Sequence, residues 1–185
     1  MRVAIVSTYP ARACGIGTFS RDLREALLRA DGVTAVDLAA IVRDTDAEQA
    51  PEVAVRIQQD QRGDYAAAAR LLERRGVEVV MVEHEYGIFG GPDGEHVLSL
   101  ARQLPQPIVL TLHTVLSLPS VGQAETLRAL CGLSTLVCVF TDTARRMVLD
   151  ARLVRPERVR VIPHGGPTEL LGAASLRGVG VGPPG

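Results

Sequence analysis

Residues 107–119 read PIVLTLHTVLSLP, and they carry the clearest signal of the expected fold. An almost unbroken apolar run leads to His113 and then breaks up, which is typical of a parallel-sheet strand buried on both faces. In an open α/β sheet, ligands bind at the loops that leave the carboxyl ends of the strands. The stretch therefore predicts a buried strand that delivers His113 to a ligand-binding edge. A hydrogen-bonded structural histidine at a strand end is an equally good interpretation of His113 taken alone.

Strands and helices alternate along the rest of the chain. Apolar, β-branched runs predict strands over residues 2–8, 33–42, 53–57, 77–82, 134–140 and 156–163. Helical spacing predicts helices over residues 18–30, 64–75, 95–104, 123–131 and 141–151, with Thr18 and Asp64 as caps of the first two. This alternation predicts an α/β fold: a Rossmann-like parallel sheet with right-handed crossovers and helices on both faces.

The composition narrows the classes of function. The chain has 185 residues, 46% of them hydrophobic, and all 20 of its positive charges are arginines. Without lysine there is no Schiff base and no Walker-type phosphate site. A net charge of -1 with mixed signs gives no basic face for nucleic acid. The three scattered cysteines fit a reducing compartment, and the N-terminus is typical of a first strand rather than a signal peptide, so we expect a cytoplasmic protein.

The end of the chain differs from the rest. After His164 the sequence becomes rich in glycine and proline and cannot bury enough apolar surface to order itself. We therefore expect one globular domain over residues 1–165 and a disordered tail over residues 166–185.

The first glycine loop contains Gly15 and Gly17 in the sequence ACGIGTF, between a predicted strand and a predicted helix. Loop amides and the helix N-terminus could face a phosphate there. The third glycine of a GxGxxG pattern is replaced by Ser20, so a tight turn without a ligand explains the loop about as well.

The second glycine loop, EHEYGIFGGPDG over residues 83–94, begins with three ionisable residues. Glu83, His84 and Glu85 follow a buried strand, and such groups are costly there unless they are paired or wet. We expect a functional site at this loop, with a PDG turn at its end. A metal site made of His84, Glu85, His96 and His113 is disfavoured because no HExxH or comparable spacing is present, and we expect neither metal nor cofactor.

These motifs together resemble the N-terminal domain of a retaining glycosyltransferase of family 4, which has the two-domain GT-B fold. The resemblance rests on RVAIVSTYPARACGIGTFSRDL, VMVEHEYGIFGG, IVLTLHTVLSLP and VRVIPHG, in this order, and covers roughly residues 1–166. It implies a nucleotide-sugar donor and a sugar or glycoconjugate acceptor as partners. Peripheral membrane contact and association through the exposed interdomain face are left open.

The resemblance also implies roles for single residues. His113 matches the family's histidine beside the donor sugar, and Gly15 and Gly17 match the loop that approaches the donor's diphosphate. His84, Glu85 and Tyr86 lie in a loop that faces the acceptor side of the cleft in similar enzymes. His164, in VIPHG, matches the family's VIPNG, where the chain leaves the first domain.

In the family a second Rossmann domain, with paired glutamates and basic residues that grip the nucleotide, follows this point. The glycine-rich tail stands in its place here. We therefore expect an acceptor-side half that is inactive, or nearly so, when alone, because the leaving diphosphate would be stabilised mainly by the other half.

Three alternatives remain at this point. An inverting enzyme would need a general base, for which His113, Glu85 or His84 is available. A non-catalytic module could bind a sugar or pair with a chain that supplies the donor domain. A nucleotide-sugar epimerase or a sugar phosphorylase could share the fold.

Overall fold

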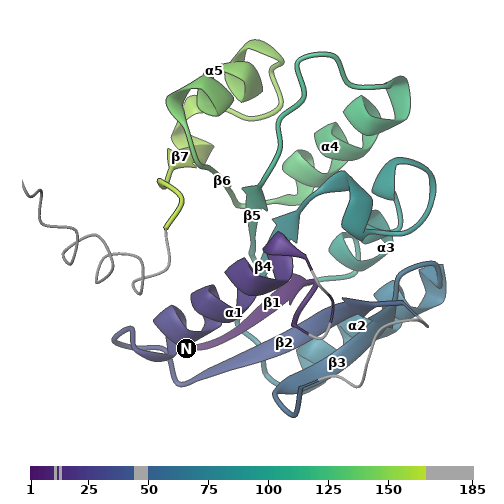
Figure 1. Cartoon of the computed structure of the whole chain (residues 1–185), viewed down its shortest axis with the longest axis vertical. Coiled ribbons are helices and arrows are strands. Elements are labelled where there is room, and N and C mark those ends of the chain that lie inside the picture. The colour runs from purple at the N-terminus through teal and green to yellow at the C-terminus, as the bar shows by residue number, and fades with distance from the viewer. Residues whose placement is uncertain (11, 13, 44–49, 166–185) are drawn as a thin grey trace, which may run out of the picture.

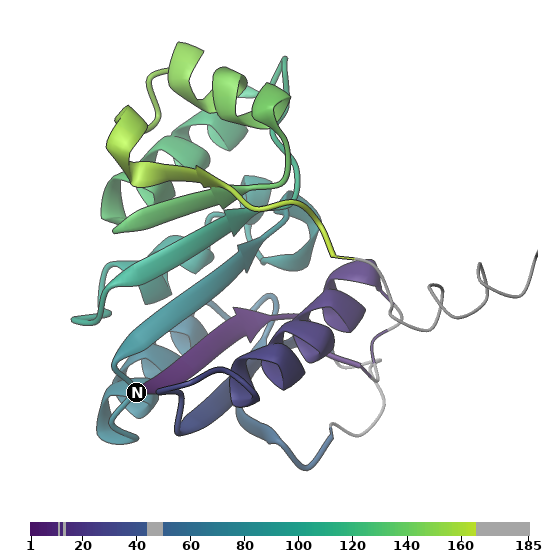
Figure 2. The ribbon, with the colours of Figure 1, turned by 90° about the vertical axis from the view of Figure 1, so that its left-hand side faces the viewer.

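The computed structural model describes residues 1–10, 12, 14–43 and 50–165, and in them the predicted parallel sheet is confirmed (Figure 1). The seven strands are all parallel, in the order β3-β2-β1-β4-β5-β6-β7. Their bounds are β1 Arg2–Ser7, β2 Ala35–Val42, β3 Val53–Gln58, β4 Val79–His84, β5 Ile108–Leu112, β6 Leu136–Val139 and β7 Val159–Val161. The arrows of the central strands all point the same way, so their carboxyl ends share one edge (Figure 2). The predicted tail, residues 166–185, lies outside the described residues.

Helices cover both faces of the sheet, as predicted. They are α1 Gly15–Leu28, α2 Arg62–Arg74, α3 Val97–Ala101, α4 Val121–Leu133 and α5 Asp142–Asp150, with short 3-10 turns η1 Tyr86–Ile88, η2 Pro92–Gly94 and η3 Pro156–Arg158. The chain steps from β1 to β2 in one direction and from β3 through β7 in the other, so right-handed crossovers put α1 on one face and α2–α5 on the opposite face. Two separate apolar clusters support this assignment of the helices to the two faces. One cluster includes Leu23 and Leu27 of α1, and the other includes the buried residues of α2–α5.

The starts of the first two helices differ from the sequence prediction. Thr18 does not cap α1; the cap is Cys14, whose Sγ accepts a hydrogen bond from the Gly17 amide at 3.3 Å. Asp64 does not cap α2 either, because α2 begins at Arg62, and the Asp64 carboxylate instead accepts from the Gln58 amide at 3.1 Å. Both helices thus begin two or three residues before the positions that capping preferences indicate.

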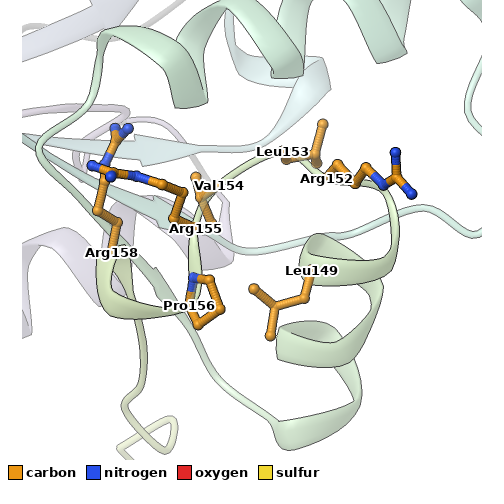
Figure 3. A pocket seen from close by; sticks show the side chains of 7 residues that line it. All are labelled: Leu149, Arg152, Leu153, Val154, Arg155, Pro156 and Arg158. Carbon is orange, nitrogen blue, oxygen red and sulfur yellow. The ribbon is translucent and has the colours of Figure 1, made fainter.

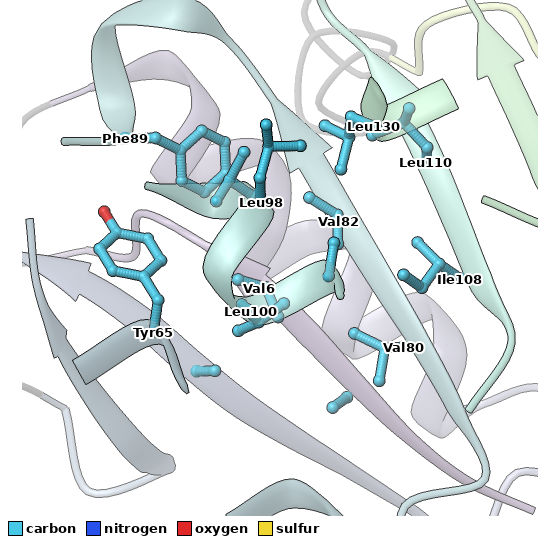
Figure 4. Packing of buried hydrophobic residues seen from close by; sticks show 14 of the residues in the cluster. Val6, Tyr65, Val80, Val82, Phe89, Leu98, Leu100, Ile108, Leu110 and Leu130 are labelled. Atoms are coloured by element: carbon cyan, nitrogen blue, oxygen red, sulfur yellow. The ribbon is translucent and has the colours of Figure 1, made fainter. Parts of the chain in front are cut away.

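Strict alternation along β4 and β5 sorts their side chains between the two faces. Leu110 and Leu112 of β5 are at most 1% exposed and join the cluster under α2–α5, which Figure 4 shows together with Val80 and Val82 of β4. Every second side chain of a strand points to the other face. Glu83 in β4 is therefore on the opposite face from His84.

Salt bridges of Asp37 link two elements at the opposite end of the sheet. Asp37 of β2 is 6% exposed and accepts hydrogen bonds from the guanidinium groups of Arg2 and Arg75 at 2.9–3.2 Å. Burial alone raises the pKa of Asp37, but the hydrogen bonds from Arg75 and Arg2 outweigh it and lower the pKa to about 2. Asp37 thereby joins the first strand to the end of α2.

Candidate functional site

A buried acid–histidine pair lies at the carboxyl edge of the sheet. The Glu83 carboxylate, 0% exposed, has its Oε2 3.0 Å from Nε2 of His113, and its Oε1 accepts from the Thr111 hydroxyl at 3.2 Å. Glu83 lies opposite Thr111 in the register of β4 and β5. The pairing of these two strands therefore brings the Glu83 carboxylate close to His113, which follows Thr111 by two residues. With Glu83 as a carboxylate, which can only accept, the proton of His113 in this hydrogen bond lies on Nε2.

The His113 ring is also held by aromatic neighbours. Phe19 of α1 meets it edge-on at a centroid distance of 4.8 Å, and Phe140, just after β6, at 5.1 Å. The His113 side chain is 7% exposed, and its Nδ1 has no hydrogen-bond partner among the described residues. The arrangement therefore leaves one nitrogen of a fixed imidazole for a ligand, as a hydrogen-bond acceptor in the neutral form and a donor in the charged form.

The loops after β4 and β5 are joined beside this pair. The Thr114 hydroxyl donates to Oε2 of Glu85, and Oε1 of Glu85 accepts from the Tyr86 amide at 2.9 Å. Glu85 is partly exposed, in contrast to Glu83. A carboxylate held in this way next to His113 can accept a hydrogen bond from a ligand hydroxyl.

His84 lies on the other side of β4, inside the core. It is 0% exposed, and neither ring nitrogen has a hydrogen-bond partner among the described residues. Its ring meets Tyr86 at 4.8 Å and stacks on Phe89 at 5.9 Å. Burial, with a smaller effect of His113, lowers the pKa of His84 to about 4, so the imidazole is neutral. A ligand cannot reach it in this conformation, and its role in binding stays a prediction.

The first glycine loop has two glycines with different surroundings. A Cβ on Gly17 would come 3.2 Å from the backbone carbon of Tyr9, so glycine lets α1 pack against the end of β1. A Cβ on Gly15 would meet nothing within 4 Å, and Gly15 is exposed in the first turn of α1. Gly17 is thus explained by packing, while Gly15 leaves open backbone at a helix N-terminus, which suits an anion.

The side chain of Tyr65, from α2, holds the second glycine loop in place through a hydrogen bond. The buried Tyr65 hydroxyl accepts from the Gly90 amide at 3.0 Å and donates to the Gln59 carbonyl at 2.9 Å. A Cβ on Gly90 would come 1.8 Å from that same carbonyl oxygen, so no other residue fits. Gly91 and Gly94 have φ of 79° and 75°, which glycine tolerates best. The predicted PDG turn is confirmed as η2. These glycines shape the loop rather than contact a ligand.

The structure brings several predicted site residues together at one edge. His113 and Glu85 lie on neighbouring loops, and His164 meets Phe19 at 5.2 Å and Phe140 at 4.9 Å. Glu83 was predicted only as one of three ionisable residues at this loop, without a role of its own, and Phe19, Phe140 and Thr114 were not predicted as site residues. Period-two alternation from His113 back to Thr111, matched to β4, is the signal that could have selected Glu83 over His84.

A cavity of about 420 Å³ lies away from this edge, between the end of α5 and β7, and three arginines are among the residues that line it (Figure 3). Arg158 donates there to the carbonyl of Cys131 in α4 at 3.0 Å and to the carbonyl of Ser134 just after α4, and Arg155 pairs with Glu157 at 3.1 Å. Two of its three arginines are thus engaged in structural contacts. Among the described residues, no group of three or more histidine, cysteine or acidic side chains is arranged to hold a metal, and no helix is long and apolar enough to cross a membrane.

Comparison with known proteins gives a family match. The model of Glycosyltransferase Family 4 matches residues 13–170. None of the curated proteins matches the sequence.

Solved structures resemble the fold at low sequence identity. An α-glucosyltransferase in complex with UDP and a 13-mer DNA matches with a TM-score of 0.58 and 14% identity, over 95% of this chain and 45% of that one. A glycosyltransferase from Rickettsia africae matches with a TM-score of 0.57 and 14% identity, over 95% of this chain and 46% of that one. The chain thus spans less than half the length of these proteins, and the likeness establishes half of a GT-B fold.

Proposed function

Because this chain belongs to glycosyltransferase family 4, we propose that it forms the acceptor-side wall of a site that transfers a sugar from a nucleotide-sugar donor to an acceptor hydroxyl. The observation that carries the proposal is the buried Glu83–His113 pair, with its 3.0 Å contact, at the ligand-binding edge of a parallel sheet. A buried carboxylate is costly unless it is paired, and here its partner is His113, the residue that the sequence places at the end of a buried strand.

In the proposed mechanism His113 positions the donor sugar and is not a general base. Glu83 binds Nε2, so Nδ1 is the nitrogen that would hydrogen-bond a sugar hydroxyl. A ring fixed by one carboxylate and two aromatic neighbours needs little reorganisation when the transition state forms. The acceptor hydroxyl then attacks the anomeric carbon on the face from which the nucleoside diphosphate leaves. The bond from this carbon to the acceptor oxygen forms as its bond to the diphosphate oxygen breaks, the hydroxyl proton passes to the leaving diphosphate, and the configuration is retained.

The loop that carries Glu85 and the first glycine loop, at Gly15, have complementary roles in this proposal. Glu85, oriented by Thr114, accepts a hydrogen bond from the acceptor. The open backbone at Gly15 lies near the donor's diphosphate, where amide groups and the helix dipole favour negative charge. The remaining charge on the leaving group would be neutralised by a second domain, so residues 1–185 alone should transfer sugar very slowly or not at all.

The test is binding of nucleotide sugars by the chain itself, followed by NMR. UDP-glucose, UDP-N-acetylglucosamine and GDP-mannose are titrated against labelled protein, and we expect at least one to shift the resonances of Gly15, His113 and Thr114. His113→Ala should remove the shift at Gly15 and Thr114, whereas Glu73→Gln, an exposed change on α2, should leave it intact. If none of the three sugars perturbs the edge, the proposal is wrong.

Glu83 is tested as a positioning residue through the ring proton of His113. Since the side chain is 7% exposed and Nε2 is hydrogen-bonded, the Nε2 proton should exchange slowly enough to be observed. Glu83→Leu should abolish that resonance. Thr111→Val removes only the bond to the other carboxylate oxygen and should keep it. A resonance that survives in Glu83→Leu would show that another group holds the ring.

A further inference from the structure

A second cavity, of about 420 Å³, opens between α4, α5 and the segment that joins β5 to α4. In Figure 1 this segment passes between the two helices before α4 begins. The lining residues are Tyr86, Val115, Leu116, Ser117, Pro119, Ala124, Leu127, Arg128, Met147, Asp150, Ala151 and Leu153. We refer to it as the α4–α5 pocket, and its volume is in the range of sites for small molecules.

The chemistry of the α4–α5 pocket is aliphatic. Most of its side chains are hydrocarbon, Met147 adds an adaptable one, and the charged groups are Arg128 and Asp150, both on exposed residues. Leu116, which lines the pocket, is 36% exposed, and just outside the lining Leu118 and Val121 are 91% and 77% exposed. Exposed apolar side chains beside an apolar cavity favour the binding of an apolar group there.

The pocket is continuous with the proposed acceptor side. Two of its lining residues, Tyr86 and Val115, directly follow Glu85 and Thr114, which are hydrogen-bonded to each other. The same two loops therefore provide the polar group beside His113 and the mouth of the pocket. An acceptor that presents its hydroxyl at Glu85 can lay the remainder of the molecule over Val115 and into the pocket.

We propose that the α4–α5 pocket binds an aliphatic chain of the acceptor, so that the acceptor is a lipid-like glycoside or alcohol rather than a free sugar. This rests on the proposed function. An aliphatic chain fits the lining better than a flat aromatic group, because Tyr86 is the only aromatic residue among the side chains of the pocket. The exposed Leu118 and Val121 then cover the part of the chain that leaves the pocket.

The test is a series of alkyl β-glucosides from methyl to octyl, titrated below their micellar concentrations and followed by NMR. Burial of each additional methylene should tighten binding about fourfold until the pocket is full. Ala124→Phe, which fills the pocket, should remove this dependence on chain length. Ala67→Phe, the same change at an exposed site on α2, should retain it. The wild-type series decides the question even if Ala124→Phe does not fold.

Equal affinity for methyl and octyl glucoside would overturn the proposal, as would a series that Ala124→Phe leaves unchanged. Binding to phosphatidylglycerol vesicles that is lost in Leu118→Ser, without chain-length dependence in solution, would assign the apolar surface to a membrane instead. Either result leaves the nucleotide-sugar titration unaffected, and a failure of that titration leaves the alkyl series unaffected. The two proposals can therefore fail separately.

Discussion

Two tyrosines with buried hydroxyl groups, Tyr65 and Tyr86, allow a sharp test of what holds the second glycine loop. Tyr65 makes two hydrogen bonds through its hydroxyl, to the Gly90 amide and the Gln59 carbonyl. The Tyr86 hydroxyl is buried and has no hydrogen-bond partner among the described residues. Burial raises the pKa of each phenol to about 12, so both are neutral at any pH used for folding experiments. The same substitution, tyrosine to phenylalanine, should therefore have opposite consequences at the two positions.

Tyr65→Phe leaves the buried Gly90 amide and the partly buried Gln59 carbonyl unsatisfied. Each costs roughly 1–3 kcal/mol, and we expect about 3 kcal/mol in total after some relaxation. With an m-value of about 2 kcal/mol/M, the urea midpoint should fall by about 1.5 M. Tyr86→Phe removes a hydroxyl that makes no bond, so stability should change by less than about 0.5 kcal/mol or rise.

The assay is urea unfolding of both variants, with hydrogen exchange of the Gly90 amide as a local readout. Exchange at Gly90 should accelerate in Tyr65→Phe and stay slow in Tyr86→Phe. Equal losses of stability in the two variants would contradict the prediction, because they would show that the hydrogen bonds of Tyr65 contribute nothing beyond the shared change in packing.

Two further predictions concern acid. The pKa of His84 is about 4 in the folded chain against 6.5 as its ordinary value, so the unfolded state binds more protons between these values. The contribution of neutral His84 to the free energy of unfolding is therefore fully present above pH 6.5, and about 3 kcal/mol of it should be lost as the pH falls toward 4. In His84→Leu the urea midpoint should change less with pH between these values than in the wild type. The pKa of Asp37 is about 2 against 3.8, so its contribution is present above pH 3.8 and is lost as the pH falls through 2. Because Arg2 and Arg75 are about one-third exposed, screening reduces this to about 1–2 kcal/mol; Asp37→Asn should lose it at pH 7, and an unchanged midpoint there would contradict the assignment.

Most of the fold could be predicted because its signals are local. Apolar runs such as the one before His113 fix strands, and their alternation with helices fixes the parallel sheet. The helix starts were less predictable. A cysteine is not a preferred cap, and Cys14 caps α1 because Gly17 packs against the backbone of Tyr9 and so sets where the helix begins.

The site was predictable in position but only partly in composition. The sequence places Glu83, His84 and Glu85 next to one another. Only the tertiary structure shows that Glu83 pairs with His113, whereas His84 is buried without a hydrogen-bond partner among the described residues. The contribution of Phe19 from α1 depends on how the helix packs on the sheet, which no local pattern encodes.

The alternation in β4 makes the site sensitive to a kind of mutation that substitution scans do not sample. Replacing Val80 or Val82 by a smaller apolar residue would trim the core and leave the direction of each later side chain unchanged. Deleting one residue from the same strand would shift the register and exchange the two faces. The imidazole of position 84 would then point to the face of the sheet that α1 covers, and the carboxylate of position 83 would be driven into hydrocarbon without its partner. The length of this strand is therefore as much a part of the site as the residues at its end.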